Sequence, residues 1–359
     1  MSQVFSVLVT FLPFIAIIFL ANLAERDRLR EGAGRSPMAF LAYLMLVLIY
    51  GFMALVGITL QGVGLMARNP GAQAPLLELY AQWGIQAEEM EGLLSSLPAV
   101  GMALWIPALV GLFLLLPGVR RGVARLLPLD PESPVHAVAL AFTMLVVMNL
   151  AFTLGIGLDT LSRALAAEET GQEMIGVLWA QQATMAFWGL VGVGWPVRRS
   201  LGQALERLGV VPMTWRQLGL GAGLGLASVV GVAGLEAAAS AVGLAPSPDV
   251  ESLTEVLLGP LLTSIPGILT LGLSAALGEE TVFRGALQPR FGLVFTSGLF
   301  ALTHSNYGIT LSTGLVFLVG MVFGWLRRRH NTSTAMVAHA VYNMTLGSVV
   351  YIYSLVQGG

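Results

Sequence analysis

Long apolar runs separated by short polar connections occupy most of the chain. Residues 4–23, "VFSVLVTFLPFIAIIFLANL", and residues 38–60, "MAFLAYLMLVLIYGFMALVGITL", both exceed the ~18 apolar residues typical of a membrane-spanning helix. At ~20 residues for each span, the pattern predicts an all-α fold, a polytopic transmembrane helical bundle of about ten spans.

The polar connections alternate in charge along the chain. Arginines are concentrated at 24–35, 118–125 and 327–330, whereas the connections at 68–97 and 249–255 are mainly acidic. Because arginine-rich connections face the cytoplasm, this alternation predicts that the N-terminus and the C-terminus both lie outside.

The positions of the polar residues divide the chain into three regions. Residues 1–197 form an N-terminal transmembrane region of about five expected spans, with few polar residues inside them. Residues 217–357 hold about five more spans and nearly all the intramembrane charge. Between them, residues 198–216 predict a short cytoplasmic amphipathic helix that lies on the membrane surface. Its apolar positions recur at helical spacing: Leu201, Ala204, Leu205 and Leu208.

Composition narrows the classes of function. The chain is 56% hydrophobic and 11% charged, and its mean hydropathy is +0.80. With a net charge of −2 there is no basic face for nucleic acid, and with no cysteine there is neither a disulfide nor a thiol nucleophile. The first apolar run lacks the basic segment and cleavage site of a signal peptide, so we expect a retained helix in an integral membrane protein.

Charged side chains within apolar segments are the candidates for chemistry, because burying each in hydrocarbon costs about 2.5–3.5 kcal/mol. Glu280 and Arg284 are four residues apart on one helix, which predicts an ion pair that we favour as structural. Glu279 is turned by about 100° from Glu280 and has no partner in its own segment.

Two histidines and an asparagine complete the set. His304 ends a short apolar segment, and the i, i+4 spacing of His339 and Asn343 places both on one helix face. Counting ~1.5 Å for each helical residue puts Glu279, His304 and His339 at similar depths from the cytoplasmic side, roughly 13–18 Å. The sequence therefore predicts a site inside the bilayer.

The three motifs that carry these residues are "EETVFR" (279–284), "FALTH" (300–304) and "HAVYN" (339–343). In this order and spacing they resemble the signature of the CPBP family, which comprises CAAX prenyl proteases and bacterial Abi-type intramembrane proteases. The resemblance covers about residues 200–357. It implies a set of catalytic positions supported by Arg284 and Phe300: Glu279, Glu280, His304, His339 and Asn343.

The resemblance also implies a reaction, which is hydrolysis of a peptide bond inside the bilayer. Glu279 would activate a water that His304 orients, since a desolvated carboxylate accepts a proton more readily than one in bulk water. His339 and Asn343 would donate hydrogen bonds to the oxyanion. The expected partners are the lipid bilayer and a membrane-embedded or lipidated peptide substrate, and the expected location is a bacterial cytoplasmic membrane.

Two alternatives remain open at this point. Glu279, His304 and His339 offer a His₂Glu set of the kind that binds catalytic zinc, although we favour a reaction without a cofactor. Buried carboxylates and histidines also form proton relays in ion-coupled transporters, and some Abi-like proteins act as immunity or scaffold proteins.

Other polar residues have weaker claims. His136, at the start of an expected span, is interpreted as a solvated interfacial histidine, and Asn149 as one half of an interhelical hydrogen bond. Glu236 fits two roles equally well, as part of the wall of the site or as a partner of a neighbouring helix.

Overall fold

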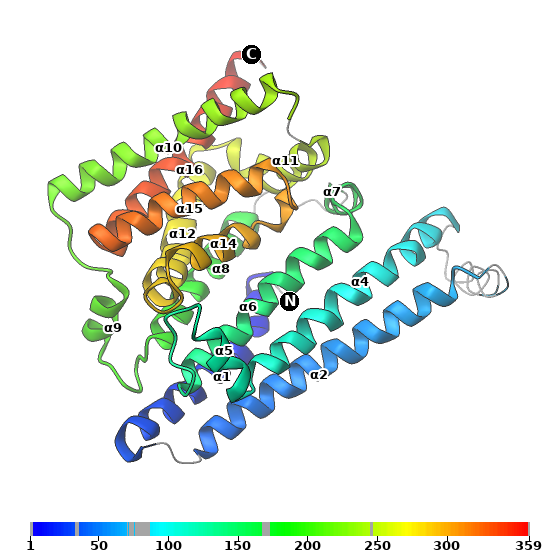
Figure 1. The fold of residues 1–359 in the computed structure, drawn as a ribbon. Helices are drawn as coiled ribbons and strands as arrows, with labels where there is room; N and C mark the ends of the chain where they lie inside the picture. The colour runs from blue at the N-terminus through cyan, green and yellow to red at the C-terminus, as the bar shows by residue number, and fades with distance from the viewer. Residues whose placement is uncertain are drawn as a thin grey trace.

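The computed structural model describes residues 3–32, 36–69, 71, 75, 87–166, 173–244 and 247–357, and every regular element within them is helical (Figure 1). The N-terminal part contains α1 (Gln3–Glu31), α2 (Pro37–Met66), α4 (Ala87–Leu114), α5 (Pro117–Val123), α6 (Pro134–Ile156), α7 (Leu158–Ala166) and α8 (Glu173–Gly192). The C-terminal part contains α9 (Leu201–Leu208), α10 (Trp215–Ala241), α11 (Pro248–Leu262), α12 (Ile265–Glu280), η1 (Thr281–Leu287), α13 (Gln288–Phe291), α14 (Leu293–Thr303), η2 (Ser305–Tyr307), α15 (Leu311–Arg329) and α16 (Thr332–Gln357). The all-α fold predicted from the sequence is confirmed.

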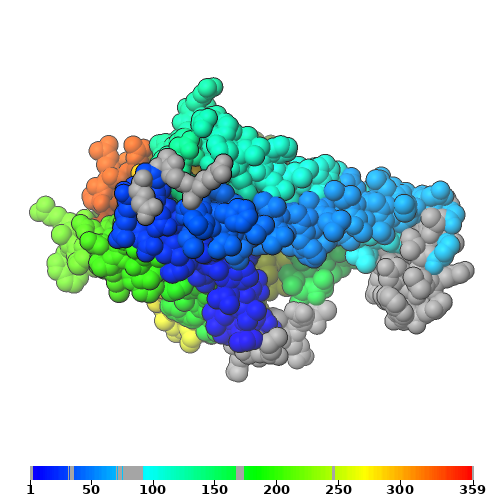
Figure 2. Space-filling view, turned by 90° about the horizontal axis from the view of Figure 1, so that it is seen from below, coloured from blue at the N-terminus to red at the C-terminus, as the bar shows by residue number. Residues whose placement is uncertain are grey.

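The two faces of α2 differ in what they contact, one packing against protein and the other facing lipid. Leu46, Tyr50 and Ala54, one turn apart, are buried against α4 and the neighbouring helices. Phe52 and Leu55 on the other face are 60% and 64% exposed, as expected for side chains that contact lipid rather than water. Figure 2 shows α2 as a long ridge across one face of the molecule, beside α1.

The second group of helices surrounds the candidate residues. α16 packs against α10, α12 and α15, and α14 packs against α15. α8, which precedes this group in the chain, packs against both α1 and α12 and thereby joins the two groups. Although α8 belongs to the N-terminal region 1–197, it therefore forms one wall of the C-terminal group of helices.

The number of helices long enough to cross a membrane is smaller than the ten expected. Among the described residues, eight have the required length and composition, or nine when the pair Pro248–Leu262 and Ile265–Phe291, bent by 111°, is counted as one span. The expected span missing from the count of nine is α14. Its 11 residues rise only about 16 Å, roughly half of a hydrocarbon core of about 30 Å.

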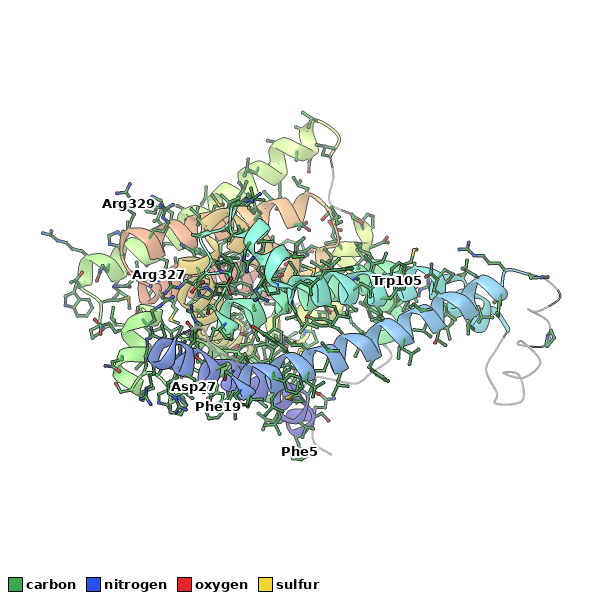
Figure 3. All side chains as sticks on the ribbon, turned by 60° about the horizontal axis from the view of Figure 1, so that its bottom comes forward. Phe5, Phe19, Asp27, Trp105, Arg327 and Arg329 are labelled. Carbon is green, nitrogen blue, oxygen red and sulfur yellow. The ribbon has the colours of Figure 1, made fainter. Side chains whose placement is uncertain are left out.

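The arginine-bearing helix ends gather at one end of the bundle, as the charge alternation predicts. The end of α1 and the short helix α9 lie toward the lower left of Figure 1, the end of α15 lies at its left and α5 near its lower centre, whereas α7 and α11 lie toward the upper right. Figure 3 places Asp27, Arg327 and Arg329 toward one end and Trp105 toward the other. Half of the acidic connection expected at 68–97 lies outside the described residues.

The amphipathic helix expected in 198–216 is α9, and its position differs in part from the prediction. Ser200 caps its start and Gly209, with φ +73°, ends it. Ala204 and Leu208 are fully buried among apolar residues that include Val193 and Ala286. The expectation that this apolar face rests on the membrane is wrong for these two residues, because protein covers them.

Candidate active site

The two adjacent glutamates lie where α12 changes its helical geometry. Ser264 caps the start of α12 by accepting a hydrogen bond from the Gly267 N–H, and the helix then runs to Glu280. The next seven residues, Thr281–Leu287, form a π-helix, η1. π-Helical turns are rare and occur frequently at functional sites, where the wider turn redirects side chains.

Glu280 and Arg284 form the predicted ion pair. Arg284 Nη1 lies 3.1 Å from Glu280 Oε1, and the two side chains are 1% and 0% exposed. Arg284 also donates through Nη2 to the Gly320 carbonyl at 3.2 Å, and its Cζ lies 4.1 Å from the Phe300 ring centroid. Phe300 thus packs on the guanidinium, which fits the supporting role expected of it.

His339 on α16 links this pair to the other glutamate. Its Nδ1 lies 2.8 Å from Glu280 Oε1, and its Nε2 lies 4.0 Å from Glu279 Oε2. The imidazole is 3% exposed and stacks on the Phe323 ring with centroids 5.2 Å apart. The bond between His339 and Glu280 was not expected from the sequence, because the two residues lie on different helices.

Glu279 is the more accessible of the two acids, with 16% of its side chain exposed. Its Oε1 accepts a hydrogen bond from Gln182 Nε2 on α8 at 3.2 Å. Its Oε2 is buried and has no hydrogen-bond partner among the described residues. Sequence reasoning missed Gln182, although two adjacent glutamines, 181 and 182, in the middle of an apolar segment were a signal of this kind.

His304 lies at the C-terminal end of α14. Its Nδ1 is 3.0 Å from the Phe300 carbonyl oxygen, and its ring stacks on Tyr307 with an interplanar angle of 8°. The Phe300 ring contacts both histidines, with centroids 5.0 Å from His304 and 6.0 Å from His339. Asn343 is half-buried one turn beyond His339 and makes no hydrogen bond to these side chains in the described structure.

The residues of the zinc alternative, Glu279, His304 and His339, do not form a ligand cluster in the described structure. Among the described residues, no three His, Cys, Asp or Glu side chains come together in a geometry that could hold a metal ion. Glu280 occupies Nδ1 of His339, and the Nε2 of the same ring is 4.0 Å from the nearest oxygen of Glu279.

Three other polar residues were interpreted from the sequence. The interhelical hydrogen bond expected of Asn149 is confirmed, since its Nδ2 donates to Ser305 Oγ of η2 at 2.9 Å. Glu236 is half-buried on α10 and makes no ion pair with any residue in the described ranges. His136, interpreted as a solvated interfacial histidine, is half-buried, and its Nδ1 accepts a hydrogen bond from the Asp130 N–H at 2.9 Å.

Comparison with known proteins agrees with the motif resemblance. Residues 261–345 match the family model of Rce1-like proteins, described as type II CAAX prenyl endopeptidases. This matched segment runs from the end of α11 into α16. It contains all the motif residues from Glu279 to Asn343.

One curated relative is the uncharacterized protein YpbD of Bacillus subtilis (strain 168), which is 36% identical over 83 residues. The aligned part is 22% of this chain and 42% of that protein, so this chain spans less than half the length of the relative. No solved structure matches the chain.

Proposed function

We propose that this protein is an intramembrane endopeptidase that hydrolyses a peptide bond of a membrane-embedded or lipidated substrate. The observation that carries the proposal is the buried series Arg284, Glu280, His339 and Glu279, joined by contacts of 3.1, 2.8 and 4.0 Å. With both acids ionised and His339 protonated, its two negative and two positive charges balance, as burial in a membrane requires.

Glu279 is the proposed general base. Its Oε2 is free of hydrogen bonds within the described structure, while Gln182 holds the other oxygen. Glu279 takes a proton from water as the water oxygen bonds to the scissile carbonyl carbon. When the carbon–nitrogen bond breaks, the protonated Glu279 returns that proton to the leaving amine nitrogen. His304, at the end of α14, is the proposed second partner of the water.

His339 is the proposed donor to the oxyanion of the tetrahedral intermediate. With Glu280 ionised, the Nδ1–H of His339 donates to it, so Nε2 carries a proton only in the imidazolium form. In that form the Nε2–H donates to the oxyanion. Asn343, one turn along the same face, supplies the second donor through its amide.

The test compares cleavage of a farnesylated peptide with a CAAX ending by the full chain in proteoliposomes. Glu279→Gln keeps the shape of the side chain and removes the base, so kcat falls by roughly 10²–10⁴ while the melting temperature stays near that of the wild type. Glu236→Gln is the matched control, because it neutralises an intramembrane acid on α10, outside the series.

Equal kcat values for the wild type and Glu279→Gln would contradict the proposal. Proton or ion flux that persists in Glu279→Gln vesicles, with no cleavage by the wild type, would favour a transporter. Loss of cleavage on chelation and its return with added zinc would favour the metal-dependent version.

A further inference from the structure

A cavity lies next to η1, and its lining does not include Glu279, Glu280, Arg284 or His339. It has a volume of about 490 Å³ and is lined by residues of α1, α6, α8, α9, η1, α13 and α14. None of the motif residues Glu279, His304 and His339 lines it. It therefore lies between the N-terminal helices and the segment that matches the family.

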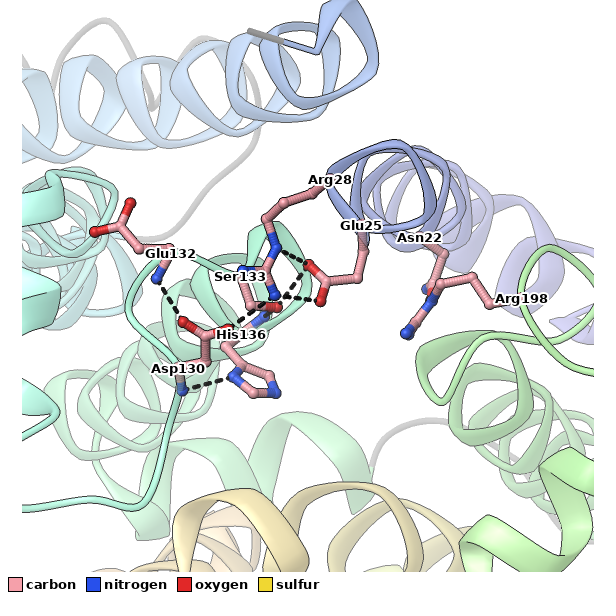
Figure 4. Close-up of polar contacts among 8 residues, drawn as sticks. All are labelled: Asn22, Glu25, Arg28, Asp130, Glu132, Ser133, His136 and Arg198. Carbon is pink, nitrogen blue, oxygen red and sulfur yellow. Dashed lines mark hydrogen bonds and ion pairs between the residues drawn. The ribbon is translucent and has the colours of Figure 1, made fainter. Parts of the chain in front are cut away.

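The end of the cavity near the arginine-bearing helix ends is strongly basic. Its lining includes two carboxylates, Glu25 and Asp130, and five guanidinium groups, so the formal charges sum to plus three. The arginines are Arg28, Arg198, Arg199, Arg207 and Arg290. Arg28 forms ion pairs with both carboxylates, at 2.7 Å from Glu25 and 2.8 Å from Asp130. Figure 4 shows these contacts.

The other four arginines have no carboxylate partner among the described residues. Arg198 donates to the Asn22 amide oxygen, beside which Figure 4 draws it, and Arg207 donates to the Gly285 carbonyl. Burial, followed by the charge of Arg199, lowers the pKa of Arg198 to about 10. Burial, followed by the charge of Arg290, lowers the pKa of Arg207 to about 10. All four remain cationic at neutral pH, so an anion bound here would relieve their repulsion.

The rest of the cavity lining is mainly apolar. Along α6 its lining recurs every three or four residues from Val135 to Val146, a rise of about 16 Å. Phe142, Met185 and Leu299 contribute to its apolar wall. This length is about half of a ~30 Å hydrocarbon core, the depth that the chain of a lipid in one leaflet occupies.

An unsatisfied donor lies beside the apolar wall, where the Trp188 ring stacks on Phe142 with centroids 6.1 Å apart. Trp188 lines the cavity, and its Nε1–H is buried with no hydrogen-bond partner among the described residues. Trp188 stands four residues before the end of α8, about 6 Å along the helix axis. In a bilayer, that level just below the headgroups is where the ester carbonyls of a glycerolipid lie.

We propose that this cavity binds an anionic glycerophospholipid of the cytoplasmic leaflet. The phosphate lies among the unpaired arginines, an ester carbonyl accepts a hydrogen bond from Trp188, and an acyl chain follows α6 into the bundle. Guanidinium groups match phosphate oxygens in pairs, and basic pockets between membrane helices on the cytoplasmic side suit such headgroups.

The experiment measures binding of phosphatidylglycerol to the purified full-length protein by native mass spectrometry and by the shift in melting temperature. Two control probes each lack one part of the ligand. Zwitterionic phosphatidylcholine lacks the net negative charge, and inorganic phosphate lacks the acyl chains. Phosphatidylglycerol is expected to bind and to raise the melting temperature, and neither other probe is expected to do so.

Two double variants compare arginines that line the basic end of the cavity with exposed arginines outside it. Arg199→Gln with Arg290→Gln removes two cavity charges and weakens phosphatidylglycerol binding about 25-fold, or about fivefold for each arginine. Arg328→Gln with Arg329→Gln removes the same charge from exposed positions at the end of α15 and leaves binding within about twofold. Equal losses in the two double variants would overturn the proposal.

A third variant tests the proposed ester contact. The wild type is expected to bind ester-linked phosphatidylglycerol more tightly than its ether-linked analogue, and Trp188→Phe, which keeps a ring and lacks the N–H, is expected to lose that difference. No preference in the wild type would remove the contact with Trp188. Equal binding of phosphatidylcholine, or displacement of phosphatidylglycerol by inorganic phosphate alone or by a farnesylated peptide, would assign the cavity to another ligand.

Discussion

Glu280 concentrates two charge-assisted contacts on a single oxygen. Its Oε1 contacts both Arg284 and His339, while its Oε2 is buried without a hydrogen-bond partner in the described part of the chain. Removing the charge of Glu280 would therefore affect a guanidinium and an imidazole together. The guanidinium is 1% exposed, so bulk solvent does not reach it to replace the carboxylate.

Glu280→Gln is expected to lower stability as well as activity. The substitution leaves Arg284 buried without its counter-ion, and breaking a buried pair in this way costs about 3–5 kcal/mol. Thermal unfolding in detergent measures the loss, with Glu251→Gln as the control because Glu251 is exposed at the start of α11. Unchanged unfolding together with abolished cleavage would instead give Glu280 a direct part in the chemistry.

His339→Gln and Asn343→Ala test the proposed oxyanion donors. Each is expected to lower kcat by about 10²–10³ with a smaller effect on KM, because an oxyanion donor acts on charge that develops in the transition state. Steady-state kinetics on the farnesylated peptide separates the two parameters. A variant that keeps kcat and raises KM alone would show that its residue binds substrate instead.

Residue spacing predicted the contacts of the candidate site within one helix, but not those between helices. The i, i+4 spacing of Glu280 and Arg284 was sufficient to predict their ion pair, because one helix carries both. The contact of Gln182 with Glu279 joins residues 97 apart in the chain, and the bond of His339 with Glu280 joins residues 59 apart. Such contacts depend on which helices pack together, which periodicity does not reveal.

At the scale of the elements, small residues set how closely the helices approach. On α10, Gly221 and Gly225 face α16: a Cβ at Gly225 would lie 2.5 Å from the Ala338 carbonyl oxygen and 3.0 Å from Val341 Cβ. Gly223, between them in sequence, has nothing within 4 Å of the corresponding position. The backbone beside His339 is therefore in direct contact with α10 at Gly225.

Gly225→Ala and Gly223→Ala form a matched pair for this contact. Gly225→Ala is expected to destabilise the protein by about 1–3 kcal/mol, because α16 must move to admit the methyl group. Gly223→Ala adds the same methyl group in open space and is expected to be neutral or to stabilise α10 by up to ~1 kcal/mol. Thermal unfolding and kcat are measured for both, and equal effects would show that the approach of α10 to α16 does not matter.

Element lengths explain why fewer helices of spanning length occur in the described residues than the ten spans expected. The expected spans included the short apolar segment that ends at His304. In the structure, Gly292 with φ +80° precedes α14 and the backbone of His304 ends it after 11 residues. A helix of that length ends inside the bilayer, and the turn η2 follows it at once. The sequence indicated a short apolar segment at this place. It did not show that the helix formed there is too short to cross the membrane alone.

At the scale of the whole molecule, the orientation in the membrane remains a prediction from charge. The chain contains no cysteine, so each introduced cysteine is the single target of a thiol reagent. Arg121, on α5, and Arg163, on α7, are 65% and 74% exposed and lie near opposite ends of α6. Arg328 is exposed at the end of α15, on the same side as α5 in Figure 1.

These three arginines provide the test of orientation. If the arginine-rich side is cytoplasmic, Arg121→Cys and Arg328→Cys are expected to react with a membrane-impermeant maleimide in inside-out vesicles, and Arg163→Cys in right-side-out vesicles. Reaction of all three from one side would contradict the arrangement of α6 as a complete span. The reverse pattern would place the arginine-lined cavity at the outer leaflet, where a lipid of the cytoplasmic leaflet cannot reach it.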